Sequence, residues 1–285
     1  MRVLIVTPHV FAGGAEKAAL NLVYHLNIMG YEASIAALSL DLSKLPNKFM
    51  RLEYILPERP YRFDKIYGVN DVLASTLREF HALVCLLREY SRGFDLLGAC
   101  NFPSYWAACF AKRSKPVVWF CSEVLGPYGQ TKDIYDRSQI FRLALESTKI
   151  IDKLIVNIGI ERIITCSEFN SRLIKRRYGR NSIVIHTGVD YEFFSEKVHD
   201  AKAQLGLDGK IILLHVGSLI QRKNHILSIR ALKVLKRKFN SIKLIIVGVG
   251  PWEPILRSEA KRLGLGGDVI FMGSVSEEML RCLYH

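Results

Sequence analysis

The sequence predicts an α/β protein made of two domains, each built on a parallel sheet. Apolar, β-rich runs alternate with helical periodicity along almost all of the 285 residues. Such near-continuous apolar strands are typical of a parallel sheet that helices cover on both faces. This alternation of strands and helices is interrupted once, by the polar stretch 190–210, and then begins again. We therefore expect one domain over 1–195 and a second, smaller domain over 196–285.

The strands expected in the first domain are seven apolar runs. They cover 2–8, 32–38, 51–56, 94–100, 116–121, 162–167 and 182–188. Three more runs form the second series, at 210–217, 242–249 and 268–273. Amphipathic stretches lie between them, and a last helix is expected to begin at Ser276. Three strands make a small sheet, so the second domain is expected to be incomplete or to have its edge covered by something else.

Composition narrows the class of protein. The chain is 49% hydrophobic, enough for two cores, and no apolar run reaches the length that spans a membrane. The formal charge of +13 predicts a negatively charged partner such as phosphates, an anionic membrane surface or nucleic acid. Lys and Arg are spread over both halves and no nucleic-acid-binding motif is present, which disfavours nucleic acid.

The six cysteines show no C-x-x-C spacing, and most lie in apolar runs. This pattern indicates reduced core thiols in a cytosolic protein and predicts neither a zinc site nor disulfides.

A glycine pair, Gly13-Gly14, follows the first strand and precedes a helix. Glycines let a ligand approach the backbone closely, and the free N–H groups of a helix start favour an anion. A tight turn that packs the helix on the sheet explains the pair equally well. The motif fits neither the dinucleotide fingerprint nor the P-loop.

The second domain opens in a similar way. Its first strand ends at Gly217, a loop carries Arg222 and Lys223, and Asn224 can cap a helix that extends to Leu235. A cation at a helix start opposes the helix dipole unless an anion binds between them. Solvated loop cations remain the alternative. Glycines also end the next strands, among them Gly248 and Gly250, so we expect a ligand in the cleft between the domains.

These segments resemble glycosyltransferase family 4, whose members are retaining enzymes of the GT-B fold that use nucleotide-activated sugars. The segments that carry the resemblance are, in order along the chain, GGAE, TCSEFNSRLIKRRYG, VIHTGVD, HVGSLIQRKN, LIIVGVGP and VIFMGSVSEEML. The resemblance implies a Rossmann-like acceptor-side domain followed by a partial domain for the nucleotide sugar. It also implies transfer of a hexosyl group, with the sugar nucleotide as co-substrate and no other cofactor.

The resemblance also implies roles for individual residues. Lys223 falls on the lysine that pairs with the donor diphosphate, and Gly217 on the glycine that admits the phosphates. The donor phosphate site is then completed by Gly13, Gly14, Ser218 and Arg222. The nucleotide base is expected along Gly248, Gly250, Met272, Gly273, Ser274 and Val275. No D-x-D motif occurs, so metal-independent transfer is expected.

The catalytic candidates lie in the first domain. Where relatives read Cys-His-Glu, this chain reads Cys121-Ser122-Glu123, and Ser122 can donate a hydrogen bond but does not ionise there. His9, near the end of the first strand, is the other candidate, although a lone histidine there is more often structural. A further departure is Ser218, which stands where the family commonly has an arginine.

The family's Glu-x7-Glu segment, expected after the helix that begins at Ser276, does not occur, so we expect a C-terminally truncated chain with little transfer activity alone. Two alternatives therefore stay open: a non-catalytic homologue, or one subunit of a split enzyme whose partner chain completes the second domain. A weaker hypothesis is that the protein binds anionic lipid or nucleic acid through its net positive charge alone.

Two further segments bear on the acceptor, which the resemblance suggests is a glycan or a lipid-linked molecule. The first is 171–180, where Arg172, Lys175, Arg176 and Arg177 either complement a helix dipole or contact anionic lipid. We expect a cytoplasmic protein, peripheral at the inner membrane face.

The second segment lies after Pro60 and alternates aromatic and basic residues. Its apolar members, Tyr61, Phe63, Tyr67 and Val69, suit an amphipathic acceptor-side surface, or a loop folded onto the core.

Overall fold

The structure is a computed structural model that describes residues 1–285 except 12, 44, 62–68, 125, 127–138 and 197–200. The chain divides into two compact units, Met1–Gly188 and Val189–His285, each described by itself below. The boundary therefore precedes the expected position, residue 195, by a short helix. That helix, α7 (Tyr191–Ser195), packs with the second unit, where Arg281 Nη1 donates to the Phe193 carbonyl at 3.2 Å.

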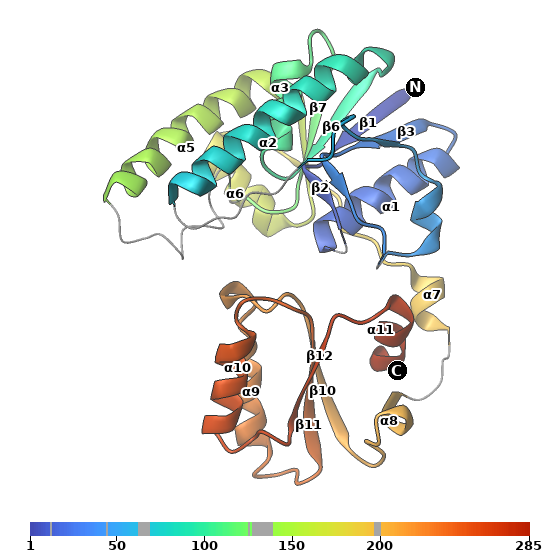
Figure 1. The fold of residues 1–285 in the computed structure, drawn as a ribbon, viewed down its shortest axis with the longest axis vertical. Helices are drawn as coiled ribbons and strands as arrows, with labels where there is room; N and C mark the ends of the chain where they lie inside the picture. The colour runs from blue at the N-terminus through green and yellow to red at the C-terminus, as the bar shows by residue number, and fades with distance from the viewer. Residues whose placement is uncertain (12, 44, 62–68, 125, 127–138, 197–200) are drawn as a thin grey trace. The chain divides into compact units, whose positions relative to one another are not determined.

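Unit 1 (Met1–Gly188) is built on a parallel sheet of seven strands in the order β5-β3-β1-β6-β7-β8-β9 (Figure 1). The strands are β1 (Arg2–Val6), β3 (Glu32–Ala36), β5 (Tyr54–Ile55), β6 (Leu96–Cys100), β7 (Val117–Cys121), β8 (Arg162–Thr165) and β9 (Ile183–Val184). A separate two-stranded parallel sheet joins β2 (His9–Val10) to β4 (Ser39–Leu40). The seven predicted strands are all present, and the two at the sheet edges are the shortest.

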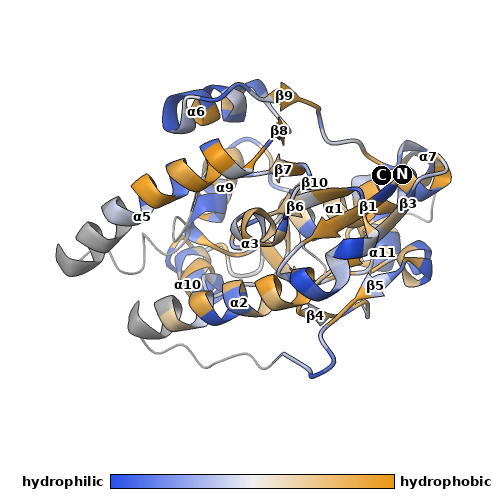
Figure 2. Cartoon of the chain, turned by 90° about the horizontal axis from the view of Figure 1, so that it is seen from above, coloured by the Kyte–Doolittle hydropathy of each residue, from blue (hydrophilic) through white to orange (hydrophobic). Residues whose placement is uncertain are grey.

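Helices cover both faces of this sheet because its side chains alternate between two cores. Val3 and Ile5 pack with α1 (Gly14–Ile28) on one face. Leu4 and Val6 belong to the larger core on the other face. The helices that contribute to this larger core are α2 (Val69–Tyr90), α3 (Ser104–Ala111), α5 (Gln139–Gly159) and α6 (Glu168–Tyr178). Figure 2 shows hydrophobic residues concentrated in β1, in β3 and along α5.

Unit 2 (Val189–His285) has a parallel sheet in the order β10-β11-β12, formed by Ile211–Val216, Ile242–Val247 and Val269–Gly273. Helices α9 (His225–Leu235) and α10 (Glu253–Arg262) cover one face, onto which Leu244 and Ile246 project. The other face carries Ile245 and Val247 and packs with α11 (Glu277–Tyr284). The expected helix start is confirmed, since the Ser276 side chain accepts from the Met279 N–H at 3.2 Å.

The predicted α/β class with parallel sheets is confirmed in both units. All six cysteines are free thiols, but Cys85 is exposed on α2, so it does not fit the expected core position. Within the described residues, no helix is both long and apolar enough to cross a membrane.

Candidate functional site

The carboxyl ends of the unit 1 strands bring the expected polar residues to one edge of the sheet. The chain runs outward from β1 to β3 and β5, then returns to β6 beside β1, so the strand order reverses between β1 and β6. Open α/β sheets bind ligands at such a reversal. His9 follows β1 here, and Asn101, with a left-handed φ of 59°, follows β6.

The start of α1 holds a carboxylate of its own. Gly13 is the N-cap and makes no side-chain cap, and a Cβ placed on it would lie 2.0 Å from Glu16 Oε2. Asn101 Nδ2 donates to Glu16 Oε1 at 3.3 Å, and burial raises the pKa of Glu16. Among the described residues, no atom lies within 4 Å of a Cβ placed on Gly14. The backbone at Gly14 is therefore open to a ligand, whereas Glu16 covers Gly13.

His9 is held between two elements of unit 1. Its Nδ1 lies 2.9 Å from Ser39 Oγ on β4, and its Nε2 lies 3.6 Å from Glu79 Oε1 on α2. The ring of Tyr61 lies 5.7 Å away, centroid to centroid. These contacts fix the orientation of the imidazole, so His9 can place a proton donor or acceptor at the sheet edge.

Ser122 and Glu123 follow β7, at the same carboxyl edge as His9. The Ser122 side chain is half-buried and Glu123 is exposed. Asn170 Nδ2 on α6 donates to the Ser122 carbonyl at 2.9 Å, and the Cys166 thiol lies 3.8 Å from the same oxygen. The structure thus anchors this loop through its backbone and holds Ser122 at a half-exposed position.

Arg177 differs from the other basic residues of α6. It turns inward and pairs with Asp152, whose side chain is fully buried. Asp152 accepts four hydrogen bonds: Tyr105 Oη at 2.7 Å, Trp106 Nε1 at 2.9 Å, Arg177 Nη2 at 3.0 Å and Tyr178 Oη at 2.7 Å. The expectation that Arg177 is a solvated or lipid-facing charge is therefore wrong, because its guanidinium forms an ion pair with Asp152 on α5. Arg172, Lys175 and Arg176 remain at the surface or partly so.

In unit 2, a cationic side chain lies beside the end of β10. A Cβ placed on Gly217 would lie 3.8 Å from both Cγ and Cδ of Lys223 and would meet no closer atom of the described residues. Lys223 ends the short 3-10 helix η3 (Gln221–Lys223), and Ser218, Arg222 and Lys223 are all exposed. The aliphatic stem of Lys223 thus lies at van der Waals distance from that position, and the Gly217 N–H donates to the Val247 carbonyl at 2.9 Å.

The other two predicted glycines have a packing role. A Cβ on Gly248, whose φ is 140°, would lie 2.0 Å from the Gly217 carbonyl oxygen. A Cβ on Gly250 would lie 2.5 Å from the Leu219 carbonyl oxygen. Both glycines therefore let the loop after β11 press against the loop after β10. This explains their presence without a ligand.

The segment 272–275, expected along the nucleotide base, lies at the end of β12. Gly273 ends β12 with a φ of 66°, and its carbonyl accepts from the Gly248 N–H at 2.7 Å. The side chains of Met272 and Val275 pack in the apolar cluster that also holds Leu283, and Ser274 is exposed. Only the backbone and Ser274 are thus presented at the end of β12.

Two histidines beside Lys223 were not singled out from the sequence. His215 on β10 stacks on His225, the first residue of α9, with ring centroids 3.8 Å apart and an interplanar angle of 16°. His215 Nδ1 lies 2.8 Å from Ser228 Oγ. Burial lowers the pKa of both rings, that of His225 to about 4, and Lys223 adds to the effect. A histidine inside an apolar strand and another at a helix start were the available signals.

In the part of the chain that the structure describes, no group of three or more His, Cys, Asp or Glu side chains is arranged to hold a metal ion.

Comparison with known proteins identifies the family. The sequence model described as Glycosyltransferase Family 4 matches residues 12–193, and the model described as Glycosyl transferases group 1 matches residues 198–285. No curated protein sequence matches the chain.

Solved structures share the fold at low sequence identity. Alr3699/HepE of Anabaena, in complex with UDP and glucose, is 18% identical with a TM-score of 0.73; the match covers 99% of this chain and 71% of that one. WaaG, a glycosyltransferase involved in lipopolysaccharide biosynthesis, is 16% identical with a TM-score of 0.70; the match covers 98% and 72%. Sucrose-phosphate synthase (tll1590) from Thermosynechococcus elongatus is 18% identical with a TM-score of 0.71; the match covers 99% and 73%.

These matches confirm a fold of the GT-B type, with both units on parallel sheets. Since the first family model spans more than half of the residues, the chain belongs to glycosyltransferase family 4.

Proposed function

We propose that this glycosyltransferase takes a hexosyl group from a nucleoside diphosphate sugar and transfers it to an acceptor hydroxyl with retention of configuration. The observation that carries the proposal is the end of β10, where Lys223 lies along Gly217 at the approach to α9. Breaking the sugar–phosphate bond builds negative charge on the diphosphate, and a fixed cation with a helix start stabilises such charge. The structure of HepE in complex with UDP-glucose supports the choice of donor.

In this proposal unit 2 holds the donor. Lys223 and the exposed Arg222 face the diphosphate, which makes transfer independent of a metal ion. The base lies along the backbone of 272–275. Unit 1 receives the acceptor where its strand order reverses between β1 and β6. His9, Ser122 and the open backbone at Gly14 lie at that edge of the sheet.

The test is binding of sugar nucleotides, measured as a thermal shift and by calorimetry. UDP-, GDP- and ADP-sugars are titrated against the wild type and against Lys223→Ala. A charge-assisted contact contributes about 1.5–3 kcal/mol, so the substitution is expected to weaken binding by about 10- to 100-fold. Lys233→Ala, an exposed lysine on the same α9, is the matched control and keeps wild-type affinity. A folded wild type that binds none of the nucleotides would rule out the proposal.

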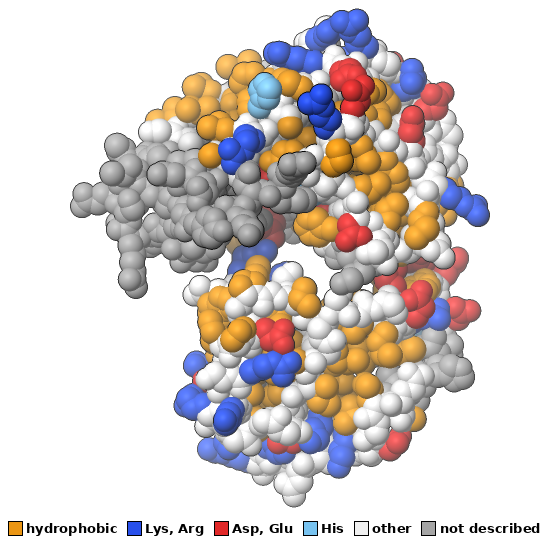
Figure 3. Space-filling model, in the orientation of Figure 1, with side chains coloured by type: hydrophobic (Ala, Val, Ile, Leu, Met, Phe, Trp, Pro, Cys, Tyr) orange, Lys and Arg blue, Asp and Glu red, His pale blue; other side chains and the backbone are white. Residues whose placement is uncertain are grey.

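We further propose that the acceptor is a glycan or a lipid-linked molecule used at an anionic membrane surface. In support, α5 exposes Ile150, Leu154 and Ile158 along one stripe, next to the exposed Lys149 and Lys153. An amphipathic, basic helix face of this kind suits a charged lipid surface. On the face drawn in Figure 3, Lys and Arg side chains are scattered over both units, which favours a diffuse surface contact over a nucleic-acid groove.

Sedimentation with vesicles tests the membrane contact. Binding is expected to phosphatidylglycerol vesicles and to fall for Leu154→Ser, with little binding to neutral phosphatidylcholine. The aromatic segment after Pro60 contributes only in part: Tyr61 packs against the core, and Phe63 and Tyr67 lie outside the described residues. Val69 begins α2.

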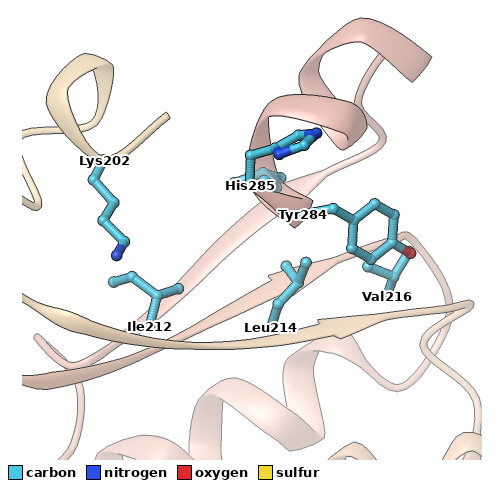
Figure 4. A pocket seen from close by; sticks show the side chains of 7 residues that line it. Lys202, Ile212, Leu214, Val216, Tyr284 and His285 are labelled. Carbon is cyan, nitrogen blue, oxygen red and sulfur yellow. The ribbon is translucent and has the colours of Figure 1, made fainter. Parts of the chain in front are cut away.

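A second candidate function is that of one subunit in a split glycosyltransferase. The observation that favours it is a hollow of about 500 Å³ beside β10, which among the described strands pairs only with β11. Ile212, Leu214 and Val216 of β10 point into it, beneath Tyr284 and His285 at the end of α11 (Figure 4). Analytical sedimentation of the chain with a candidate second subunit tests it, because a monomer in the mixture would contradict the split.

A further inference from the structure

The stacked histidines of unit 2 have a property that the proposed reaction does not use. His225 is only 1% exposed, yet neither of its ring nitrogens has a hydrogen-bond partner in the part of the chain that the structure describes. A buried polar group without a partner costs about 1–3 kcal/mol, and native proteins rarely keep one without a purpose.

The position of the ring points to the purpose. Its Cε1 atom, which lies between the two ring nitrogens, is 3.9 Å from a Cβ placed on Gly217. This edge of the imidazole therefore lies beside the same glycine that the Lys223 side chain borders at 3.8 Å. Because His225 is also the first residue of the eleven-residue α9, the free N–H groups of that helix begin here. Three independent features thus favour an anion at one place.

In the absence of an anion, the surroundings keep the ring neutral. The groups that act on His225 are Lys223 of η3 and His215 of β10, and both disfavour a positive charge. On His215 the charged neighbour is again Lys223, and Ser228 of α9 supplies a neutral hydroxyl. The register neighbour of His215 on β11 is the apolar Ile246. A diphosphate would reverse this balance, because its negative charge offsets Lys223 and attracts a proton to the pair.

We propose that the His215–His225 pair takes up one proton from solvent when a diphosphate binds beside Lys223 and the start of α9. The site therefore binds a nucleoside diphosphate more tightly as the pH falls. The proposal rests on the proposed function, since it concerns the regulation of the same donor site. No covalent bond forms or breaks; the proton comes from water and returns to it when the nucleotide leaves.

Calorimetry with UDP at pH 7.5 and pH 6.0, in two buffers of different ionisation enthalpy, tests the proposal. The β-phosphate of UDP itself titrates in this range, so wild type is compared with His225→Asn. The wild type is expected to take up additional protons, and its affinity to rise by up to about tenfold per pH unit relative to the variant. His81→Asn, an exposed histidine on α2, is the matched control and behaves as wild type.

The outcomes separate the two proposals. UDP binding with the same proton uptake in wild type and His225→Asn would overturn this inference and leave the donor site intact. Failure of UDP, GDP and ADP to bind at either pH would overturn both. If His225→Asn does not fold, the wild type labelled with ¹³C at histidine Cε1 gives the answer by NMR. A histidine resonance must then titrate at higher pH when UDP or inorganic pyrophosphate is added, and an unchanged titration overturns the inference.

Discussion

The carboxyl edges of the two sheets differ in how their polar groups are satisfied. In unit 1 two polar side chains at this edge have partners: His9 meets Ser39 and Glu79, and Asn101 donates to Glu16. In unit 2 the exposed Lys223 lies along Gly217, and the buried His225 beside it has no hydrogen-bond partner among the described residues.

Under the proposed function, this difference corresponds to a preformed surface in unit 1 and a site in unit 2 that an anion completes. Satisfied hydrogen bonds fix side-chain orientation, which suits a surface that must present an acceptor hydroxyl in one pose. Unmatched positive groups instead gain most when charge arrives, which suits a leaving diphosphate. In the proposed function, unit 1 therefore positions the acceptor and unit 2 stabilises the leaving diphosphate.

The largest expected effect comes from the buried acid of unit 1. Asp152→Asn leaves Arg177 partly buried beside a neutral amide, and loss of one partner of a buried pair costs about 3–5 kcal/mol. Unit 1 should lose that much free energy of unfolding, as measured by hydrogen exchange, which reads the two units separately.

The control for Asp152 is Asp268 of unit 2, which pairs with Lys236 and Lys243 closer to the surface. Asp268→Asn should cost about 1 kcal/mol or less, because solvent screens such pairs. Equal losses for both variants would mean that unit 1 is not built around Asp152.

The next effect compares two glycines. Gly248→Ala forces a Cβ against the Gly217 carbonyl at a left-handed φ, and the conformation alone costs about 1–3 kcal/mol. Unit 2 should be destabilised and UDP binding weakened, because the loop that carries Gly217 must move. Gly14→Ala meets no described atom, so thermal unfolding should change by at most about 1 kcal/mol. A large loss of stability in Gly14→Ala would contradict the open backbone at α1.

These glycines also show how far the sequence could lead. Apolar periodicity predicted every strand of the seven-stranded and three-stranded sheets, because their apolar pattern is local, but it did not predict the short strands β2 and β4. The glycines at strand ends were located as well, but their structural role was not predicted. Gly248 and Gly250 are needed because they pack against carbonyl groups of a loop some 30 residues earlier in the chain.

The same limit explains the side chains that were misjudged or overlooked. Arg177 read as a surface charge because its partner Asp152 lies 25 residues away on another helix. The pairing of His215 with His225 depends on how η3 returns the chain over β10, and no spacing rule predicts a stacked pair. Sequence patterns thus predicted the helices and strands, whereas the surroundings of the candidate site residues depend on contacts between those elements.

The pH dependence of stability is a smaller effect. His225 has a folded-state pKa of about 4, below its ordinary value of 6.5, so the folded state binds fewer protons than the unfolded state. Its contribution is fully present above pH 6.5 and is lost as the pH falls toward 4, by up to about 1.4 kcal/mol per pH unit. Urea unfolding of unit 2 at pH 7 and pH 5 should show this loss, and His225→Asn should reduce it. An equal loss in the variant would assign the effect to other groups.

The smallest expected effect compares two serine caps. Ser167 accepts from the Asn170 N–H at the start of α6, and Ser276 accepts from the Met279 N–H at the start of α11. Removing such a cap costs about 1 kcal/mol of helix stability. Because α6 buries Ile174 and Tyr178, Ser167→Ala should lower the global stability of unit 1 by that amount.

The outcome for α11 should be local, since none of its residues is fully buried. Ser276→Ala is therefore expected to speed hydrogen exchange within α11 while the rest of unit 2 keeps its protection. A nucleotide bound along 272–275 would suppress this fraying, because the base contacts the segment that leads into the helix. Exchange measured with and without UDP thus tests the donor site from its far end: if α11 in Ser276→Ala opens equally in both conditions, the base does not lie along that segment.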